Sequence, residues 1–180
     1  MKIKHIEFAR LAALSVATAA IMSFAAPARA EIQTSGKVIP LELAQAAAQA
    51  AISRCESNGY RVSASVVDAQ GVERVALRGD RSTIHTRETA FKKAYTIVTL
   101  GPIFGQTTTG ELTEKINKTP TGPALSTVSN IILLAGGVSI QLGYETIAAI
   151  GVGGAPGGAL DQICAQAGAA AIQDRVNGLR

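Results

Sequence analysis

The sequence predicts an α+β domain in which helices cover an antiparallel sheet. Alanine-rich segments with apolar residues at helical spacing lie at both ends of the expected domain, over residues 41–58 and 159–177. Between them, segments that alternate apolar and polar residues come in pairs joined by short turns, as in β-hairpins. Paired hairpins favour an antiparallel sheet over a doubly wound parallel one.

The first thirty residues have the pattern of a secretory signal peptide. Lys2, Lys4 and Arg10 give a positive start, residues 11–26 are largely apolar, and residues 28–30 (Ala-Arg-Ala) fit the small-x-small rule for cleavage. The alternative is a membrane anchor, but the apolar stretch is shorter than the ~20 residues that a span needs. We therefore expect a periplasmic or secreted protein that has no membrane span after cleavage.

The charge and composition of the chain exclude several classes of protein. Without the first thirty residues, 13 basic and 12 acidic residues remain, so the basic surface of a nucleic-acid-binding protein is absent. An apolar content of 47% with 17% charged residues excludes a disordered chain. We expect no nucleic-acid partner, a short lead-in over residues 31–39 and a single domain over residues 40–180.

The first half of the domain is predicted to be a helix followed by a β-hairpin. Pro40 suits the first position of a helix, where a missing N–H costs nothing, and Gly59 can end the helix in the left-handed conformation. Residues 61–67 and 72–78 alternate with a period of two, and residues 68–71 (Asp-Ala-Gln-Gly) suit the turn between them. One face of this hairpin would point toward a core and the other toward water or a ligand.

A second helix is predicted to begin near Thr86. Its apolar residues are stacked at helical spacing from Phe91 to Val98. Lys92 and Lys93 fall outside this apolar stripe. The helix therefore has one face for the core and one for charged side chains.

The region that follows the second helix is the least regular part of the sequence. Residues 101–123 are rich in Thr, Pro and Gly and contain a short helix around residues 111–117. A structureless stretch of this length is either functional or mobile. Residues 131–134 and 138–142 then predict a second hairpin, and residues 146–152 a continuous apolar strand.

The two cysteines of the chain are candidates for a disulfide. Cys55 falls in the last turn of the first helix and Cys164 near the first turn of the last helix. If these helices lie side by side and antiparallel, the two thiols come to the same end, and an exported chain suits a disulfide. The alternative is a pair of buried free thiols, which are common in alanine-rich helices. We favour the disulfide.

A glycine-rich loop precedes the last helix. Residues 151–158 (Gly-Val-Gly-Gly-Ala-Pro-Gly-Gly) resemble a phosphate cradle, but Pro156 stands where the third glycine of G-x-G-x-x-G belongs and no Walker lysine follows. A tight turn from strand to helix explains the loop better. Its N–H groups remain able to hold a carboxylate or a propionate. Asp161 is interpreted as a helix-start residue.

His85 is the only histidine after the first thirty residues, and it lies in a polar loop. A zinc site needs about four ligands, and the chain offers only Cys55, Cys164 and His85. A nucleophilic triad would depend on His85 as its base, and no G-x-S-x-G motif is present. The alternatives for His85 are an ordinary surface residue and a ligand for a bound group.

Several segments together resemble the GlcG/HbpS-like haem-binding family. They occur in the family's order and cover nearly all of residues 41–176. The segments are 65–71 (Ser-Val-Val-Asp-Ala-Gln-Gly), 93–96 (Lys-Ala-Tyr-Thr), 136–138 (Gly-Gly-Val), 147–158 (Ile-Ala-Ala-Ile-Gly-Val-Gly-Gly-Ala-Pro-Gly-Gly), 161–162 (Asp-Gln) and 165–168 (Ala-Gln-Ala-Gly). Two positions depart from the family pattern, because Ser139 replaces a frequent proline and Gly153 a frequent serine.

The resemblance implies a profilin-like α+β domain with a central antiparallel sheet of about five strands. It also implies an exported protein that binds haem or a related tetrapyrrole and acts as a haem or iron carrier or as the accessory of a sensor partner. Histidine near the start of the second helix recurs in exported members, which makes His85 the candidate ligand of the haem iron. Tyr95 and Arg78 are the further candidates for contacts with the cofactor.

A different class of function is an enzyme or binding protein for a small carboxylate or carbonyl metabolite of the glycolate type. Its candidate groups would be Arg78, His85 and Tyr95. Because the sequence offers no pair of nucleophile and base and no metal cluster, we favour binding over catalysis and assign no catalytic residue.

Small side chains bury little apolar area each, so we also expect a thin core and a homo-oligomer.

Overall fold

The structure is a computed structural model that describes residues 36–179. The predicted signal peptide and most of the lead-in lie outside the described residues. Within them, no helix is long and apolar enough to cross a membrane. The helices are α1 (Leu41–Glu56), α2 (Thr86–Phe104), α3 (Thr109–Asn117), α4 (Gly122–Leu125), α5 (Gly158–Ala170) and α6 (Gln173–Asn177), and the strands are β1 (Ser63–Asp68), β2 (Glu73–Arg78), β3 (Gly137–Leu142) and β4 (Glu145–Gly153).

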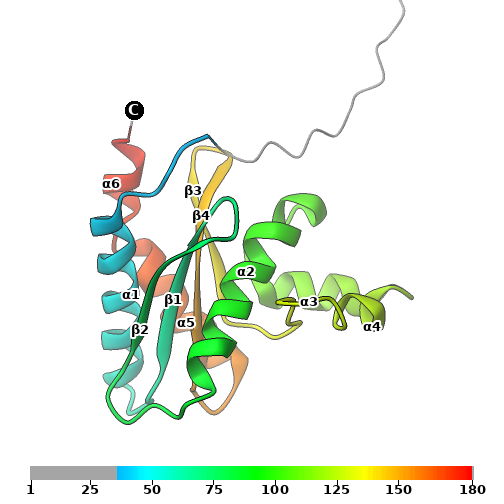
Figure 1. Cartoon of the computed structure of the whole chain (residues 1–180), viewed down its shortest axis with the longest axis horizontal. Coiled ribbons are helices and arrows are strands. Elements are labelled where there is room, and N and C mark those ends of the chain that lie inside the picture. The colour runs from blue at the N-terminus through cyan, green and yellow to red at the C-terminus, as the bar shows by residue number, and fades with distance from the viewer. Residues whose placement is uncertain (1–35, 180) are drawn as a thin grey trace, which may run out of the picture. The chain divides into compact units, whose positions relative to one another are not determined.

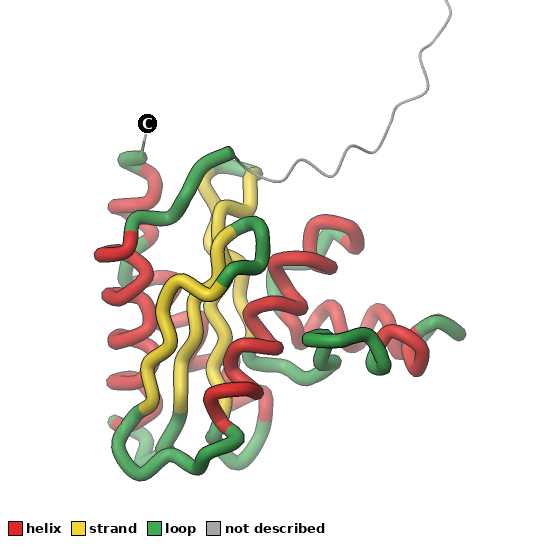
Figure 2. The backbone as a smooth tube through the Cα atoms, viewed as in Figure 1, coloured by secondary structure: helices red, strands yellow, loops and turns green. Residues whose placement is uncertain are grey.

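The four strands form one antiparallel sheet in the order β2-β1-β4-β3. Helices α1, α5 and α6 lie on one side of this sheet, and α2 lies on the other (Figure 1). The tube in Figure 2 shows the same layers, with the strands between the two groups of helices. The α+β class and the antiparallel sheet that the sequence predicts are therefore confirmed.

The structure corrects two of the predicted elements. Residues 131–134 are not a strand: the Ile132 N–H donates to Thr96 Oγ1 at 2.8 Å, so this segment runs along α2 and does not join the sheet. The second hairpin is instead β3–β4. Within residues 36–179 the sheet has four strands, which roughly matches the expected number of about five. The last predicted helix is divided into α5 and α6, and Ile172 enters the core at the break.

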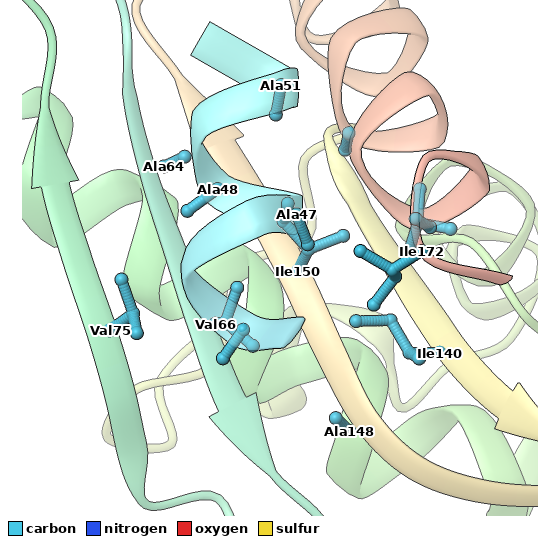
Figure 3. Packing of buried hydrophobic residues seen from close by; sticks show 14 of the residues in the cluster. Ala47, Ala48, Ala51, Ala64, Val66, Val75, Ile140, Ala148, Ile150 and Ile172 are labelled. Atoms are coloured by element: carbon cyan, nitrogen blue, oxygen red, sulfur yellow. The ribbon is translucent and has the colours of Figure 1, made fainter. Parts of the chain in front are cut away.

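The face of the sheet toward α1 and α5 is aliphatic. Val66 and Ile150 project from neighbouring strands toward α1, whose surface there consists of alanines such as Ala47 and Ala51 (Figure 3). Small helix residues allow α1 and α5 to approach one another closely, and a side chain at Gly168 of α5 would collide with the Ala47 carbonyl oxygen. This face holds the larger of the two hydrophobic clusters.

A disulfide joins the two helices on this side. Cys55 in α1 and Cys164 in α5 are bonded, with their Cα atoms 5.5 Å apart and both residues buried. The pairing that the sequence favours is therefore present in the structure. It links positions separated by 109 residues and closes most of the domain into one loop.

The face of the sheet toward α2 is built mainly from very small residues. Val67 of β1 is a larger residue on this face, and the small ones are Ser63 and Ser65 in β1, Gly137 and Ser139 in β3, and Ala149, Gly151 and Gly153 in β4. A side chain at Gly151 would collide with the Ala90 carbonyl oxygen, so α2 rests directly on the backbone of β4. The family-like glycines at these positions therefore set the distance between the helix and the sheet.

Candidate functional site

His85 lies at the entrance of α2, which begins at Thr86 as predicted. Two polar contacts fix this start: Thr86 Oγ1 donates to the Thr83 carbonyl oxygen at 2.7 Å, and the Thr86 and Ser63 hydroxyl oxygens lie 2.8 Å apart. The carbonyl oxygen of His85 accepts the backbone N–H and the hydroxyl of Thr89. The backbone at His85 is thus held by α2, and the residue after it, Thr86, is tied to β1.

The imidazole of His85 is exposed and makes no polar contact of its own within the described chain. The residue is exposed, and among residues 36–179 its side chain has no hydrogen-bond or ion-pair partner. Ile84 beside it is 81% exposed. The loop therefore presents one nitrogen ligand and one apolar side chain to the surroundings.

Arg78 bonds to the loop that precedes His85, whereas Tyr95 lies farther along α2. The Arg78 guanidinium donates from Nε and Nη2 to the Ser82 carbonyl oxygen at 3.1 and 2.6 Å, and so it holds the loop that leads to His85. Tyr95 lies ten residues after His85, about 15 Å along the helix axis. The structure does not gather these three residues around one point, although a common metabolite site would need them together.

A groove lies between the β1–β2 hairpin and α2. Its volume is about 330 Å³, and its lining residues are Gly71, Glu73, Arg87 and Phe91. The Arg87 guanidinium donates to Glu73 Oε2 at 2.9 Å, and Ser65 Oγ donates to Glu73 Oε1 at 2.8 Å. The sequence analysis did not single out Glu73 or Arg87, because they are distant in sequence and belong to no motif.

The ring of Tyr95 supports one wall of this groove. It lies against Gly71 at the hairpin turn, where a Cβ atom would come within 2.8 Å of Tyr95 Cε2. Gly71 also has φ of +80°, which favours glycine. The centroids of the Tyr95 and Phe91 rings are 5.7 Å apart and the rings are tilted by 44°, so two aromatic side chains from α2 form one continuous surface.

A buried ion pair on the α2 face is a further feature that the sequence analysis missed. Lys93 Nζ lies 2.6 Å from Asp161 Oδ2, and the two side chains are only 2% and 4% exposed. The apolar spacing from Phe91 to Val98 predicted that Lys93 lies outside the core, and this prediction was wrong. The small residues of the sheet leave room for the long Lys93 side chain to reach α5. The signal that could have found this pair is that both residues belong to the family-like segments.

The carboxylate of Asp161 also organises the glycine-rich loop. Its Oδ1 accepts the Ala155 N–H at 2.9 Å, so within the described chain this loop binds the protein's own carboxylate. Burial raises the pKa of the Asp161 carboxyl above its usual range, while Lys93 and the N–H groups of Ala155 and Gly154 lower it. Asp161 is thus more than a helix-start residue, because it joins α5 to α2.

These features allow a test of whether the residues present suit haem. A haem iron needs an available axial ligand, such as a histidine, a cysteine thiolate, a methionine or a tyrosine, and the porphyrin needs apolar surroundings. His85 provides the first and Ile84 contributes to the second, but His85 lines neither described groove, the second of which is lined by Gln45, Ala46, Gln49 and Leu77. No group of three or more His, Cys, Asp or Glu side chains in the described residues is suited to hold a bare metal ion.

The chain was compared with known families and structures. Residues 39–170 match the family described as haem-degrading protein HbpS-like. The chain is 37% identical to HbpS in a crystal structure, with a TM-score of 0.68, and the match covers 81% of this chain and 97% of that chain. For the double mutant of Streptomyces reticuli HbpS, the identity is 36%, the TM-score 0.68 and the coverage 89% of this chain and 97% of that chain.

A more distant similarity includes a structure with haem. The crystal structure of a PduOC:heme complex shares 25% identity with a TM-score of 0.66, over 76% of this chain and 96% of that chain. No curated protein sequence matches the chain. The family match spans most of the domain, and the structural matches agree with it. The chain therefore belongs to the HbpS-like family.

Proposed function

We propose that the protein is an exported haem-binding protein in which His85 ligates the haem iron. The observation that carries this proposal is the exposed imidazole at the entrance of α2, which has no partner among the described residues of a chain in the HbpS-like family. The haem complex of a relative supports the choice of cofactor. Haem would supply an iron centre, and the chain would supply its axial ligand.

Haem bound to His85 needs more apolar surface than one copy of the chain offers there. The groove walls described above do not include His85, whereas Ile84 is exposed beside it. One histidine after the predicted signal peptide permits either a five-coordinate haem or a haem shared between two subunits. We therefore propose a homo-oligomer in which a second copy covers the His85 surface.

The other two candidate residues have indirect roles in this proposal. Arg78 is a positioning residue, because its two hydrogen bonds to Ser82 hold the loop before His85. Tyr95 supports the groove at the hairpin from behind Gly71. Export and a role as a haem carrier or sensor accessory complete the proposal, and the signal-like first thirty residues support export.

Titration of residues 31–180 with hemin tests the role of His85. We expect the wild-type protein to shift the Soret band of hemin and His85→Ala to bind at least tenfold more weakly. His85→Met offers a thioether ligand at the same place, so this variant should bind hemin with a Soret position of its own. Tyr144→Ala, which removes an exposed ring at the β3–β4 turn, is the control and should behave as wild type. An unchanged spectrum and affinity in His85→Ala would exclude His85.

A further inference from the structure

The groove between the β1–β2 hairpin and α2 has features of a second binding site. We infer that it binds a small zwitterion with an apolar body, of the size and chemistry of an apolar α-amino acid. This inference does not depend on haem binding, because His85 does not line the groove. Its basis is the arrangement of one cation, one anion and an aromatic wall around one small volume.

The local backbone directs Glu73 into the groove. Val66 pairs with Val75 and Val67 with Glu73, so Arg74 is an extra residue and β2 contains a β-bulge. Without the bulge, Glu73 would lie on the same face as Val75, which belongs to the aliphatic core. The bulge instead turns the Glu73 carboxylate toward α2, and bulges are known to re-aim side chains next to functional sites.

The Glu73 carboxylate is held in this position from both sides. Ser65 donates to one of its oxygens and Arg87 to the other, and its side chain is 24% exposed, against 63% for Arg87. An ion pair as exposed as this contributes little to stability, so it opens at low cost. The serine keeps the carboxylate in place when the arginine moves.

The two charges determine the ligand class. A ligand with only a carboxylate would compete with Glu73 for Arg87 and leave two anions beside one cation. A ligand with only an ammonium group would leave Arg87 without its partner. A ligand that carries both groups can pair its carboxylate with Arg87 and its ammonium group with Glu73, so every charge remains paired.

The remaining wall suits an apolar body of limited size. Phe91 lines the groove and the Tyr95 ring lies behind Gly71, so the ligand would pack against aromatic surface. A volume of about 330 Å³ is at the lower end of the range of about 300–1,000 Å³ for small-molecule pockets. A single small metabolite therefore fits the groove better than a tetrapyrrole does.

Nuclear magnetic resonance titration of residues 31–180 tests this site with three probes of one shape. L-phenylalanine carries both charges, 3-phenylpropionate lacks the ammonium group and phenethylamine lacks the carboxylate. We expect L-phenylalanine to shift the amide signals of Gly71, Glu73, Arg87 and Phe91, with a dissociation constant at least tenfold below those of the other probes. Equal binding of the three probes, or no binding of L-phenylalanine at millimolar concentration, would overturn the inference.

Two charge variants assign each contact. In Arg87→Gln the carboxylate of the ligand loses its partner on the protein, so L-phenylalanine and phenethylamine should bind equally. In Glu73→Gln the ammonium group loses its partner, so L-phenylalanine and 3-phenylpropionate should bind equally. Arg54→Gln makes the same charge change on an exposed residue of α1, across the sheet, and should bind as wild type. Should Glu73→Gln disturb the hairpin, Arg87→Gln alone decides, and an unchanged preference in that variant contradicts the inference.

Discussion

The two faces of the sheet pack by different means. Toward α1 and α5 the sheet presents valine and isoleucine, which pack against alanines of the helices. Toward α2 it presents mainly glycine, serine and alanine, with Val67 as a larger residue, and the helix lies on the strand backbone at Gly151. The packing of helices on the first face depends on the volume of the side chains there. The packing of α2 on the second face depends on how small the side chains are. Only the second face carries the helix that begins beside His85.

Each face also has its own covalent or ionic link. The disulfide joins α1 to α5 on the aliphatic side, and the Lys93–Asp161 ion pair joins α2 to α5 across the edge of the sheet. A side chain at Gly136 would come within 2.8 Å of Lys93 Nζ, so the small residues of this region also make room for the ion pair. The comparison predicts that substitutions on the α2 face cost more stability than those on the aliphatic face.

The largest effect is expected for Gly151→Ala. The new Cβ atom would collide with the Ala90 carbonyl oxygen, and neither backbone can move without separating α2 from β4. We expect a loss of about 4 kcal/mol in the free energy of unfolding, measured by urea denaturation. Gly157→Ala adds the same methyl group at a glycine with no atom within 4 Å, and it should cost less than about 1 kcal/mol.

The opposite face provides the comparison for this result. Ile150→Val removes one buried methyl group from the aliphatic core and should cost about 0.5–1.5 kcal/mol. If Gly151→Ala costs no more than Ile150→Val in the same experiment, the two faces do not differ as described here.

The buried ion pair gives the next largest effect, and its two partners should differ. Asp161→Asn leaves the Lys93 ammonium group buried without an anion, which costs about 3 kcal/mol. Lys93→Met leaves the Asp161 carboxyl, which can become neutral because burial already raises its pKa. Thermal and urea denaturation should therefore show a smaller loss for Lys93→Met. The opposite order of stability would contradict this account of the pair.

The disulfide should contribute somewhat less. Replacing Cys55 and Cys164 together by alanine removes a cross-link that spans 109 positions, and we expect a loss of about 2–4 kcal/mol, because the unfolded chain gains conformational freedom. The fold itself should remain, since the aliphatic cluster around the two residues is intact. Mass spectrometry without reductant should find the bond in the wild-type protein, and free thiols there would refute it.

The smallest effect concerns pH. Since the pKa of Asp161 is raised, the folded protein keeps this proton at pH values where the unfolded chain has lost it. The contribution of Asp161 to the free energy of unfolding is therefore present below about pH 4 and decreases as the pH rises through the raised pKa. The stability of the wild type relative to Asp161→Asn should be greater at acidic than at neutral pH. A difference that increases toward neutral pH would mean that the pKa is lowered.

Local patterns in the sequence were sufficient to predict most elements of the fold. The turn over residues 68–71 and the start of α2 at Thr86 lie where expected. Gly59 has the expected positive φ, although α1 ends slightly earlier, at Glu56. Residues 131–134 have the composition of a strand, but a hydrogen bond to Thr96 on another element holds them along α2. No local pattern contains that contact.

The candidate site was less predictable for the same reason. His85 was identifiable because it is the only histidine of the predicted mature chain. The pairing of Glu73 with Arg87 depends on a β-bulge, and that of Lys93 with Asp161 on the small residues of the sheet. Both depend on the distance and register between elements, which composition and periodicity do not specify.

The most direct test of the proposed function is the absorption spectrum of the protein before any ligand is added. The full chain would be expressed in a bacterium that makes ample haem, and the protein would be isolated from the periplasm. We expect a Soret band in the wild-type protein and its loss or strong reduction in His85→Ala. A wild-type protein without a Soret band, or a band of equal strength in His85→Ala, would contradict the proposal that this chain binds haem through His85.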